Sequence, residues 1–315
     1  MFGNLAILLV AFAVILPSKC EQADENIINE INNMDLSWKA GRNFEEGGYV
    51  RRLLAKSKPR PAKTLPVVSR FDSDVVIPDK FDSRLEWPEC PTISHIQDQG
   101  ACGACWAVAG AATFSDRVCV ASKGKTIACD GGDDYRAWVF FRINGVTTGG
   151  DYNTTEGCQP YTVEPCEHHT EGSRPNCYAM PEPVIEKCQN ECTNKNYGKS
   201  MTQDLFKVSR AYKVMSDVNQ IKREILKHGP VQAGFTVYED FNVYKTGIYR
   251  HTVGNKVGEH SVRILGWGWE GNQQYWLVAN SWNYNWGENG TFRVAMGVNE
   301  CGIEEAVHAG IPIIE

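Results

Sequence analysis

The hydrophobic pattern divides the first seventy residues into three zones. Residues 2–16 form the only long apolar run, which is too short to span a bilayer comfortably and is followed by a polar segment. We interpret residues 1–19 as a secretory signal peptide. Residues 20–50 are polar, but apolar side chains at helical spacing predict a short helix near residues 27–34. Residues 51–70 carry seven basic residues, three prolines and no acidic residue, so we expect an exposed, cleavable linker.

Two further patterns predict a helix and a β-hairpin in the body of the chain. Residues 107–114 are small and apolar, as in a buried helix. The apolar runs 261–267 and 275–280 flank Glu270-Gly271-Asn272, which is a hairpin-turn signal. If the turn centres near Glu270, antiparallel pairing places His260 opposite Asn280.

The composition is that of an ordinary globular protein. The 315 residues are 42% hydrophobic and 22% charged, with 29 Gly, 14 Pro and 12 Cys, which excludes a disordered chain, a collagen-like chain and a tiny disulfide scaffold. The net charge is −6 and no long basic stripe is present, so nucleic acid is not an expected partner.

The charge distribution separates an N-terminal segment from the body. Residues 20–76 are neutral overall, whereas residues 77–315 carry a net charge of −7. We predict a pro-segment over residues 20–76 that is held to the body partly by charge and is released as carboxylates become protonated. The alternative is a flexible terminal arm with no regulatory role.

Cysteine usage indicates an oxidising compartment and at least one unusual cysteine. In a secreted chain the cysteines of the body are disulfide candidates. There are eleven of them: Cys90, Cys102, Cys105, Cys119, Cys129, Cys158, Cys166, Cys177, Cys188, Cys192 and Cys301. Because eleven is odd, at least one stays reduced, pairs between chains or serves chemistry. Glycosylation sequons at Asn153 and Asn289 fit a secreted glycoprotein.

Cys105 has the sequence context of a nucleophile. It lies at the start of the predicted helix, where the helix dipole and the first backbone N–H groups favour a thiolate. The Gly-rich turn before it lets backbone N–H groups point at an incoming carbonyl, and Gln99 is able to donate a second hydrogen bond to an oxyanion. Cys102 and Cys105 also form a C-x-x-C pair, which allows a zinc half-site or a redox pair. No second C-x-x-C follows, so we expect neither a metal nor another cofactor.

His260 is the best candidate for a base among the seven histidines. If it faces Asn280 across the hairpin, the side-chain amide holds one imidazole tautomer and directs the other ring nitrogen at the thiol. The alternative is a half-buried histidine that Asn280 merely satisfies in an ordinary hairpin.

These segments resemble the cathepsin B-like cysteine proteases of the papain family. Residues 99–106, Q-G-A-C-G-A-C-W, resemble the family's active-site signature, and Asn280-Ser281-Trp282 resembles its Asn-Ser-Trp. Cys166-Glu167-His168-His169, within a Pro- and Cys-rich insertion, resembles the occluding loop of cathepsin B. Residues 38–44 resemble its short propeptide. The resemblance runs from about residue 21 to the end of the chain.

The resemblance implies an α+β, two-lobed papain-like fold that is disulfide-bonded and carries an N-terminal propeptide. A helical lobe would carry Cys105, a β-rich lobe would carry His260 and Asn280, and the cleft would lie between them. The implied segments are a signal peptide at 1–19, a propeptide at 20–76 and a mature protease domain at 77–315, with an occluding loop at about 158–192.

The resemblance also implies the reaction. The thiolate of Cys105, paired with protonated His260, attacks a peptide carbonyl while the Cys105 N–H and Gln99 hold the oxyanion. His260 then protonates the leaving amine, and water hydrolyses the thioester with His260 as base. Trp282 would shield the contact between His260 and Asn280 from water.

The implied partners are peptide and protein substrates, the chain's own propeptide as an inhibitor, and cystatin-like protein inhibitors. No nucleic acid or membrane partner is expected, and the protein is expected to be a monomer. The expected location is the secretory pathway, leading to the lysosome or the exterior, including a digestive lumen.

The loop resemblance implies a C-terminal dipeptide-releasing activity beside endopeptidase activity. His168 and His169 would bind the C-terminal carboxylate of the substrate. Two contacts would latch the loop to the body, one between Asp98 and His168 and the other between Arg174 and position 285. Because position 285 is Asn, we expect the second latch to be weak and Asn285→Asp to strengthen it.

The pocket for the second residue before the scissile bond departs from the family pattern. The family's acidic residue on the pocket floor corresponds to Ala306. Asp133 and Asp134 follow Gly131-Gly132, where the family has Tyr-Pro on the other wall. We expect a preference for apolar residues, with arginine accepted only if Asp133 or Asp134 reaches inward.

By family analogy the disulfides would be Cys90–Cys119, Cys102–Cys129, Cys158–Cys192 and Cys166–Cys177. The stretch between Cys119 and Cys129 is much shorter than in the family and lacks a helix that relatives carry. Losing a core helix exposes apolar surface, since each large apolar side chain contributes roughly 1.5–3 kcal/mol when buried. The alternative function is therefore an inactive or misfolding-prone shortened member that acts as a binding decoy.

Overall fold

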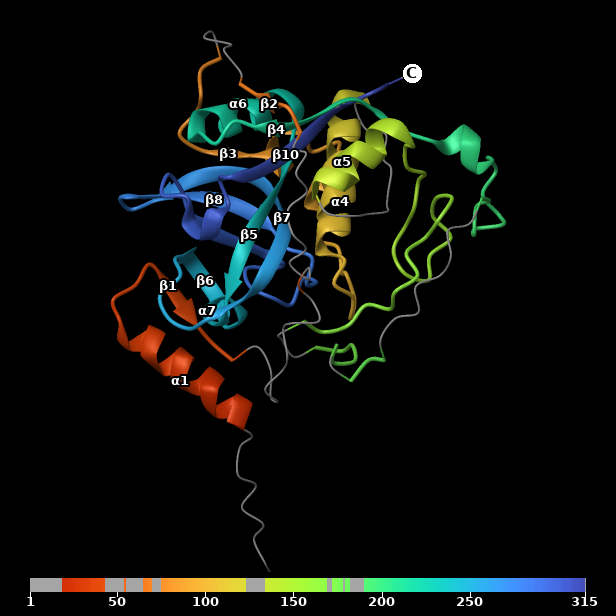
Figure 1. The fold of residues 1–315 in the computed structure, drawn as a ribbon. Coiled ribbons are helices and arrows are strands. Elements are labelled where there is room, and N and C mark those ends of the chain that lie inside the picture. Colours follow the sequence, from red (N-terminus) through yellow and green to blue (C-terminus); the bar gives the residue numbers. More distant parts are fainter. Residues whose placement is uncertain are drawn as a thin grey trace, which may run out of the picture.

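The computed structural model describes residues 19–42, 54, 65–69, 75–122, 134–168, 172–177, 179–181 and 190–314. The helices α4 and α5 lie side by side against the upper part of a large sheet, and α1 lies beyond β1 at the other end (Figure 1). The mixture of helices and sheet agrees with the expected α+β class. None of the described helices is long and apolar enough to cross a membrane.

The α-helices are α1 (Lys19–Asn33), α2 (Ser83–Glu86), α3 (Pro91–Ser94), α4 (Cys105–Ser122), α5 (Asp134–Ile143), α6 (Val218–His228) and α7 (Glu239–Asn242). Two 3₁₀ helices, η2 (Met201–Asp204) and η3 (Glu300–Gly302), complete the set in the described part of the chain. The predicted helix near residues 27–34 corresponds to α1, and the predicted buried helix corresponds to α4.

The strands are β1 (Trp38–Ala40), β2 (Val67–Val68), β3 (Phe81–Asp82), β4 (Val208–Val214), β5 (Val231–Tyr238), β6 (Tyr244–Tyr249), β7 (Lys256–Glu270), β8 (Gln273–Ala279), β9 (Thr291–Ala295) and β10 (Ala306–Pro312). Their order in the sheet is β1-β6-β9-β8-β7-β5-β10-β4-β2, and β3 pairs with β7 outside this path. Most pairings are antiparallel, but β6–β9 and β2–β4 are parallel.

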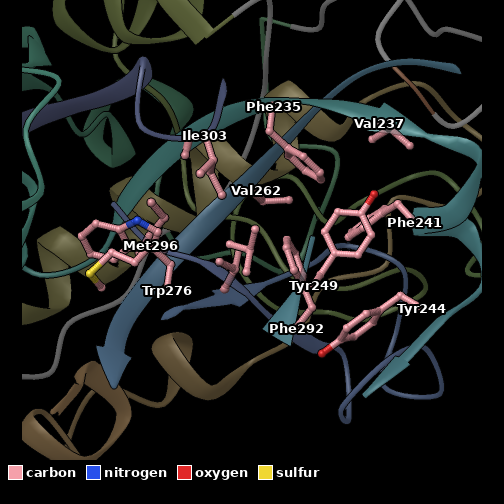
Figure 2. Packing of buried hydrophobic residues seen from close by; sticks show 14 of the residues in the cluster. Phe235, Val237, Phe241, Tyr244, Tyr249, Val262, Trp276, Phe292, Met296 and Ile303 are labelled. Atoms are coloured by element: carbon pink, nitrogen blue, oxygen red, sulfur yellow. The ribbon is translucent and has the colours of Figure 1, made fainter. Parts of the chain in front are cut away.

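The two largest hydrophobic clusters of buried residues support the fold. The larger one lies among the sheet strands, where the ring of Phe241 contacts those of Phe235, Tyr249 and Phe292 at centroid distances of 5.0–5.1 Å (Figure 2). The smaller one joins α4 to α5, where Phe114 stacks on Phe141. Helix α4 is buried along most of its length, because its first three turns consist largely of alanine and other small residues.

Buried polar contacts fix α4 against the sheet. Arg263 of β7 forms a buried ion pair with Asp116 of α4, with 2.6 Å between Nη1 and Oδ2. At the start of α4 the backbone oxygen of Trp106 accepts a hydrogen bond from Gln232 Nε2 of β5 at 2.9 Å. These contacts set where the first turn of α4 lies relative to β5 and β7.

The hairpin of β7 and β8 is present, but the predicted register is wrong. Glu270 pairs with Gln273, so the turn is the two residues Gly271 and Asn272 rather than a turn centred near Glu270. A bulge at Leu265 then shifts the pairing to Arg263 opposite Ala279. A two-residue turn with Gly at positive φ matches the twist of the strands, and the shift places His260 diagonally from Asn280.

The N-terminal segment binds the body at several points. β1 extends the sheet by pairing with β6, and Trp38 packs against Tyr244 and Tyr249. Leu54 is buried in the larger core beside Gly258.

The expectation of an exposed linker over residues 51–70 is wrong for Leu54 and Leu65, whereas Pro66 and Val67 are exposed. Leu54 and Leu65 are buried, and Val67–Val68 form β2 against β4. Apolar side chains interrupt the basic run, and burying them against the body offsets the preference of the charged neighbours for water.

Three of the four expected disulfides are present: Cys90–Cys119, Cys158–Cys192 and Cys166–Cys177. Cys102 is a free thiol, so its expected bridge to Cys129 is not formed, and Cys129 lies outside the described residues. Most of the shortened stretch between Cys119 and Cys129 also lies outside them. Cys301 is a half-buried thiol whose pKa is raised by burial and by Glu300.

Candidate active site

Cys105 is the first residue of α4 and is fully buried. Val108 N and Ala107 N donate hydrogen bonds to the backbone oxygen of Ala104, so the first helical turn begins directly at Cys105. The N–H groups of this turn and the helix dipole favour a negative charge on Cys105 Sγ. The structure therefore confirms the predicted position of the Cys105 thiol at a helix N-terminus.

His260 and Asn280 contact each other as predicted, despite the different register. His260 Nε2 lies 2.8 Å from Asn280 Oδ1, and both residues are buried. The same oxygen accepts a hydrogen bond from Ser281 N at 2.8 Å, which fixes it as the acceptor. Nε2 must then carry the proton, so in the neutral imidazole Nδ1 is the basic nitrogen. Nδ1 is buried and has no hydrogen-bond partner among the described residues.

Trp282 covers the imidazole of His260. The two rings stack with 4.8 Å between centroids and 25° between planes. Burial lowers the pKa of His260 to about 4, and the nearby His168 acts in the same direction, whereas the hydrogen bond to Asn280 opposes the shift. With the N-terminal segment in place, this lowered pKa favours the neutral imidazole above about pH 4.

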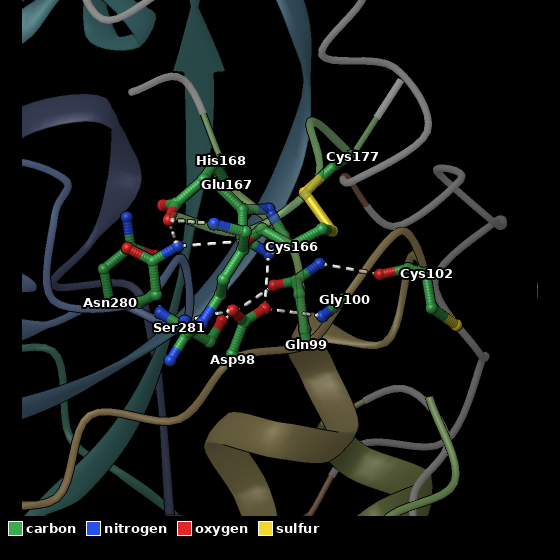
Figure 3. A network of polar contacts seen from close by, with 12 residues as sticks. Asp98, Gln99, Gly100, Cys102, Cys166, Glu167, His168, Cys177, Asn280 and Ser281 are labelled. Carbon is green, nitrogen blue, oxygen red and sulfur yellow. Dashed lines mark hydrogen bonds and ion pairs between the residues drawn. A yellow bond between two sulfur atoms is a disulfide. The ribbon is translucent and has the colours of Figure 1, made fainter. Parts of the chain in front are cut away.

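Gln99 is buried and held by neighbours of the candidate thiol and base (Figure 3). Its Oε1 accepts a hydrogen bond from Ser281 Oγ at 2.7 Å, and its Nε2 donates to the backbone oxygen of Cys102 at 2.8 Å. Ser281 also accepts the backbone N–H of Gln99 at 3.1 Å. An amide nitrogen carries two hydrogens, so the donation to Cys102 does not exclude donation to an oxyanion. Ser281 is a positioning contact that sequence reasoning did not single out.

The first predicted latch of the loop is confirmed. His168 is fully buried, and its Nε2 lies 2.6 Å from Asp98 Oδ1. The imidazole also lies nearly parallel to the ring of Trp282, with 6.5 Å between centroids and 12° between planes, and Trp282 in turn stacks on His260. His169 lies outside the described residues.

The second predicted latch is wrong. Arg174 does not pair with Asn285; its Nη1 lies 2.9 Å from Asp98 Oδ2, on the carboxylate that also binds His168. Asn285 instead donates from Nδ2 to both carboxylate oxygens of Glu167 at 3.1 Å. The reason is that a guanidinium binds a carboxylate more strongly than a neutral amide oxygen, and Asp98 lies within its reach.

Glu167 is the centre of a second set of loop contacts that the sequence did not reveal. It is buried, and its Oε2 accepts a hydrogen bond from Asn283 Nδ2 at 2.9 Å while Oε1 accepts the backbone N–H of Arg174 at 3.2 Å. Asn283 also donates to the backbone oxygen of Cys166. The only signal in the sequence is the pair of asparagines at 283 and 285 after the Asn-Ser-Trp motif.

The cysteines of this loop are not a metal site. Cys166, Cys177 and His168 place potential ligand atoms within 4.8 Å of one another. The two sulfurs are joined in a disulfide, however, and a disulfide sulfur is not a thiolate ligand.

The predicted pocket residues are partly described. Asp134 begins α5 and Ala306 begins β10, and both lie against Gly234: a Cβ on Gly234 would be 3.2 Å from Asp134 Oδ2 and 3.4 Å from the Ala306 Cβ. The structure therefore brings Asp134 and Ala306 together. Gly131, Gly132 and Asp133 lie outside the described residues.

Comparison with known proteins identifies close relatives. The sequence profile described as papain family cysteine protease matches residues 77–311. "Cathepsin B-like cysteine proteinase 4" of Caenorhabditis elegans is 41% identical over 332 aligned positions, covering 98% of this chain and 97% of the relative. A "Cathepsin B-like cysteine proteinase" of Schistosoma japonicum is 39% identical, covering 93% and 92%.

A solved structure agrees with these matches. That of "proCathepsin B S9 from Trypanosoma congolense" superposes with a TM-score of 0.77 at 30% identity, covering 92% of this chain and 98% of that one. The match spans both the N-terminal segment and the body, which confirms the papain-like fold with its propeptide. The chain belongs to the papain family of cysteine proteases, as a cathepsin B-like member, and is a cysteine peptidase.

Proposed function

We propose that Cys105, His260, Asn280 and Gln99 carry out peptide hydrolysis, with Trp282 covering the base. The contact between His260 Nε2 and Asn280 Oδ1 is the observation that carries this proposal. Because it leaves the proton on Nε2, Nδ1 can take the proton of the Cys105 thiol, and the resulting imidazolium can later protonate the leaving amine. The thioester is then hydrolysed by water with His260 as base.

The oxyanion of the tetrahedral intermediate would be held by the Cys105 N–H and by Gln99. Support comes from the anchoring of Gln99, whose side-chain oxygen is bound by Ser281 and whose backbone N–H is bound by the same residue. A donor fixed in this way does not have to reorganise when charge develops on the substrate oxygen.

The loop that carries His168 would give the enzyme dipeptide-releasing activity in addition to endopeptidase activity. In this proposal His168 and His169 bind the substrate's C-terminal carboxylate at the end of the cleft. The stacking of His168 on Trp282, which itself covers His260, supports a place near the reacting bond. Loop opening would free the cleft for longer chains.

The N-terminal segment would act as an inhibitor until it is removed. Leu54 packs on Gly258, only two residues before His260, so this segment reaches the catalytic strand. We propose a signal peptide at 1–19, a propeptide at 20–76 and a mature domain at 77–315, which fits a family match that begins at residue 77. The proposed setting is the lysosome or the exterior, and the proposed partners are peptides, proteins and cystatin-like inhibitors, with the enzyme acting as a monomer.

A labelling experiment tests the proposed nucleophile. The activated protein is treated with a thiol-directed epoxide at mildly acid pH, and the modified cysteine is found by peptide mapping. We expect Cys105 to be labelled and Cys301 not, because the raised pKa of Cys301 keeps it a thiol. Cys105→Ala should lose both labelling and hydrolysis, whereas Cys301→Ser should keep both. Hydrolysis above background by a folded Cys105→Ala protein would refute the assignment.

A further inference from the structure

Asp134, the first residue of α5, accepts hydrogen bonds from two strands of the sheet. Its Oδ1 is bound by Ser261 Oγ of β7 at 2.7 Å and by Gln232 Nε2 of β5 at 2.6 Å. Ser261 directly follows His260 in the chain. One carboxylate oxygen therefore joins α5, β5 and β7 beside the proposed base.

Gln232 continues this connection to the helix that carries the thiol. Its Nε2 also donates to the backbone oxygen of Trp106 at 2.9 Å, and Trp106 directly follows Cys105. Its Oε1 accepts a hydrogen bond from Trp138 Nε1 of α5 at 2.9 Å, which fixes the orientation of the amide. Both hydrogens of Nε2 are thus used. The hydrogen bonds that begin at Asp134 therefore end at the residue after the proposed nucleophile.

We call these linked hydrogen bonds, from Ser261 through Asp134 and Gln232 to the Trp106 backbone oxygen, the Asp134 bridge. Ser261 and Gln232 are buried, and the side chain of Asp134 is 13% exposed. A carboxylate oxygen can accept two hydrogen bonds, and bonds to an ionised acceptor are roughly twice as strong as neutral ones. Oδ2 of Asp134 lies 3.8 Å from His308 Nδ1, which is longer than a hydrogen bond. The bridge is therefore a shielded, charge-assisted connection.

The bridge lies at the thiol end of the contact between α4 and β7. Farther along α4, the ion pair between Asp116 and Arg263 joins the same two elements. A cavity beside Ser261 is lined by Val108 and Ala109 of α4, so apolar packing between the two elements is incomplete here. The ion pair fixes α4 at a point away from the thiol, whereas the bridge acts at its first turn.

We propose that Asp134 is a positioning residue for peptide hydrolysis. Through the bridge it sets how the Cys105 thiol lies relative to the His260 imidazole. A proton passes between these two groups only when they are within hydrogen-bond reach, so a small shift of α4 against β7 lowers the amount of thiolate–imidazolium pair. This inference rests on the proposed function, because it concerns the nucleophile and base that the proposed function uses.

A small thiol reagent tests the inference without a peptide substrate. Dipyridyl disulfide reacts with a thiolate by thiol–disulfide exchange, which forms a mixed disulfide on the cysteine and releases thiopyridone. At about pH 4 to 5 an isolated thiol is almost fully protonated, so the rate for the activated enzyme reports the thiolate that is paired with imidazolium. Cys105→Ala gives the background rate of Cys102 and Cys301, the other free thiols in the described part of the chain.

Three variants break or restore the bridge. Ser261→Ala removes its contact with β7 without changing any charge, and we expect the rate at acid pH to fall by about fivefold, as for one net hydrogen bond. Asp134→Ala removes both contacts and should lower the rate by about tenfold. Asp134→Asn should recover most of this loss, because an amide oxygen accepts the same two bonds. If the bridge acts as one unit, adding Ser261→Ala to Asp134→Ala has no further effect.

Ser83→Ala is the matched control. Ser83 is also a buried serine, and its hydroxyl donates to β7 at the backbone oxygen of Leu265. Its loss removes a hydrogen bond from the same strand but leaves the bridge intact. We expect Ser83→Ala to lower the midpoint of thermal unfolding about as much as Ser261→Ala does, while the rate at acid pH stays that of the wild type.

The outcomes separate this inference from the proposed function. If the wild-type enzyme shows no reaction at acid pH that depends on Cys105, the proposed pair of nucleophile and base is wrong. If that reaction is present but Ser261→Ala and Asp134→Ala keep the wild-type rate, Asp134 has no positioning role. An equal fall in Ser83→Ala also overturns the inference, because it assigns the effect to general loss of stability. If Asp134→Ala does not fold, the comparison of Ser261→Ala with Ser83→Ala still decides.

Discussion

His168 Nε2 lies 2.6 Å from Asp98 Oδ1, and the other oxygen of the same carboxylate lies 2.9 Å from Arg174 Nη1. One side chain, directly before Gln99, therefore holds the loop segment at both of its charged contacts. Arg174 is charged at every relevant pH, whereas His168 adds a charge only when its imidazole is protonated. The two charged contacts thus share one carboxylate rather than forming separate latches, and they add to the second set of loop contacts at Glu167.

Asp98→Asn should open the loop, because it removes the charge that both His168 and Arg174 contact. We expect the ratio of dipeptide release to endopeptidase activity to fall by about tenfold, as expected for losing roughly 1.4 kcal/mol of charge-assisted hydrogen bonding. The measurement compares a peptide with a free C-terminal carboxylate with its amidated form. If hydrolysis of both peptides falls by the same factor, Asp98 acts by positioning the neighbouring Gln99 and not by holding the loop. Arg174→Gln, which removes one contact, should give an intermediate ratio.

Asn285→Asp should loosen the loop, not strengthen it. Asn285 Nδ2 faces the carboxylate of Glu167, so an Asp here places a second carboxylate beside the buried carboxylate of Glu167. We expect lower dipeptide release and a lower midpoint of thermal unfolding at pH 7, with a smaller difference at pH 4, where the pair can share a proton. Asn285→Ser is the neutral control. Higher dipeptide release by Asn285→Asp would show that Arg174 moves to position 285.

His260→Ala should cost more activity than Asn280→Ala. The base itself is not replaceable, so we expect a loss of about 10³-fold or more in kcat for His260→Ala. In Asn280→Ala the stacking of Trp282 still holds the ring, so a loss of about ten- to a hundredfold is expected from misplacement and from the wrong tautomer. Steady-state kinetics with thermal unfolding as a folding control decide the order. An equal or larger loss for Asn280→Ala would contradict the roles proposed.

Asp24→Asn should strengthen propeptide binding at neutral pH. Burial and the charge of Glu239 raise the pKa of Asp24 to about 6, although Arg42 opposes this. A raised carboxyl pKa means that the folded proenzyme binds this proton more tightly than the unfolded chain does. The stability that the protonated Asp24 carboxyl contributes is therefore fully present below about pH 4 and is lost as pH rises through 6. The asparagine stays neutral, so we expect about 1 kcal/mol of extra stability at pH 7, after allowing for solvent screening, and little change at pH 4.

This prediction is checked by thermal unfolding of the proenzyme with Cys105→Ala, which removes the proposed nucleophile and so should prevent self-cleavage. Glu30→Gln is the matched control, because Glu30 is an exposed carboxylate on the same helix, α1, and its loss should change stability little at either pH. If Asp24→Asn lowers the stability at pH 7, the negative charge of Asp24 favours propeptide binding, and the prediction is wrong.

The sequence by itself determined the features that depend on neighbours along the chain. Small apolar residues after Cys105 predict a buried helix that starts at the thiol, and the structure has α4 there. The runs around the turn at residue 271 predict a hairpin, although the predicted turn centre near Glu270, and with it the register, was wrong, because the turn consists of Gly271 and Asn272. The active-site motifs also resembled those of the family, and that resemblance implied the contact between Asp98 and His168.

Only the tertiary structure decided which distant side chains share a partner. Arg174 contacts Asp98 rather than position 285, because a long guanidinium selects the nearest carboxylate in space, which the order of residues along the chain does not specify. The same holds for Leu54, a single apolar residue in a basic segment that is buried against Gly258. Asp134 and His308 are 174 positions apart and meet because β5 and β10 pair beneath the start of α5. Such contacts depend on packing between elements, and a one-dimensional pattern carries no record of that packing.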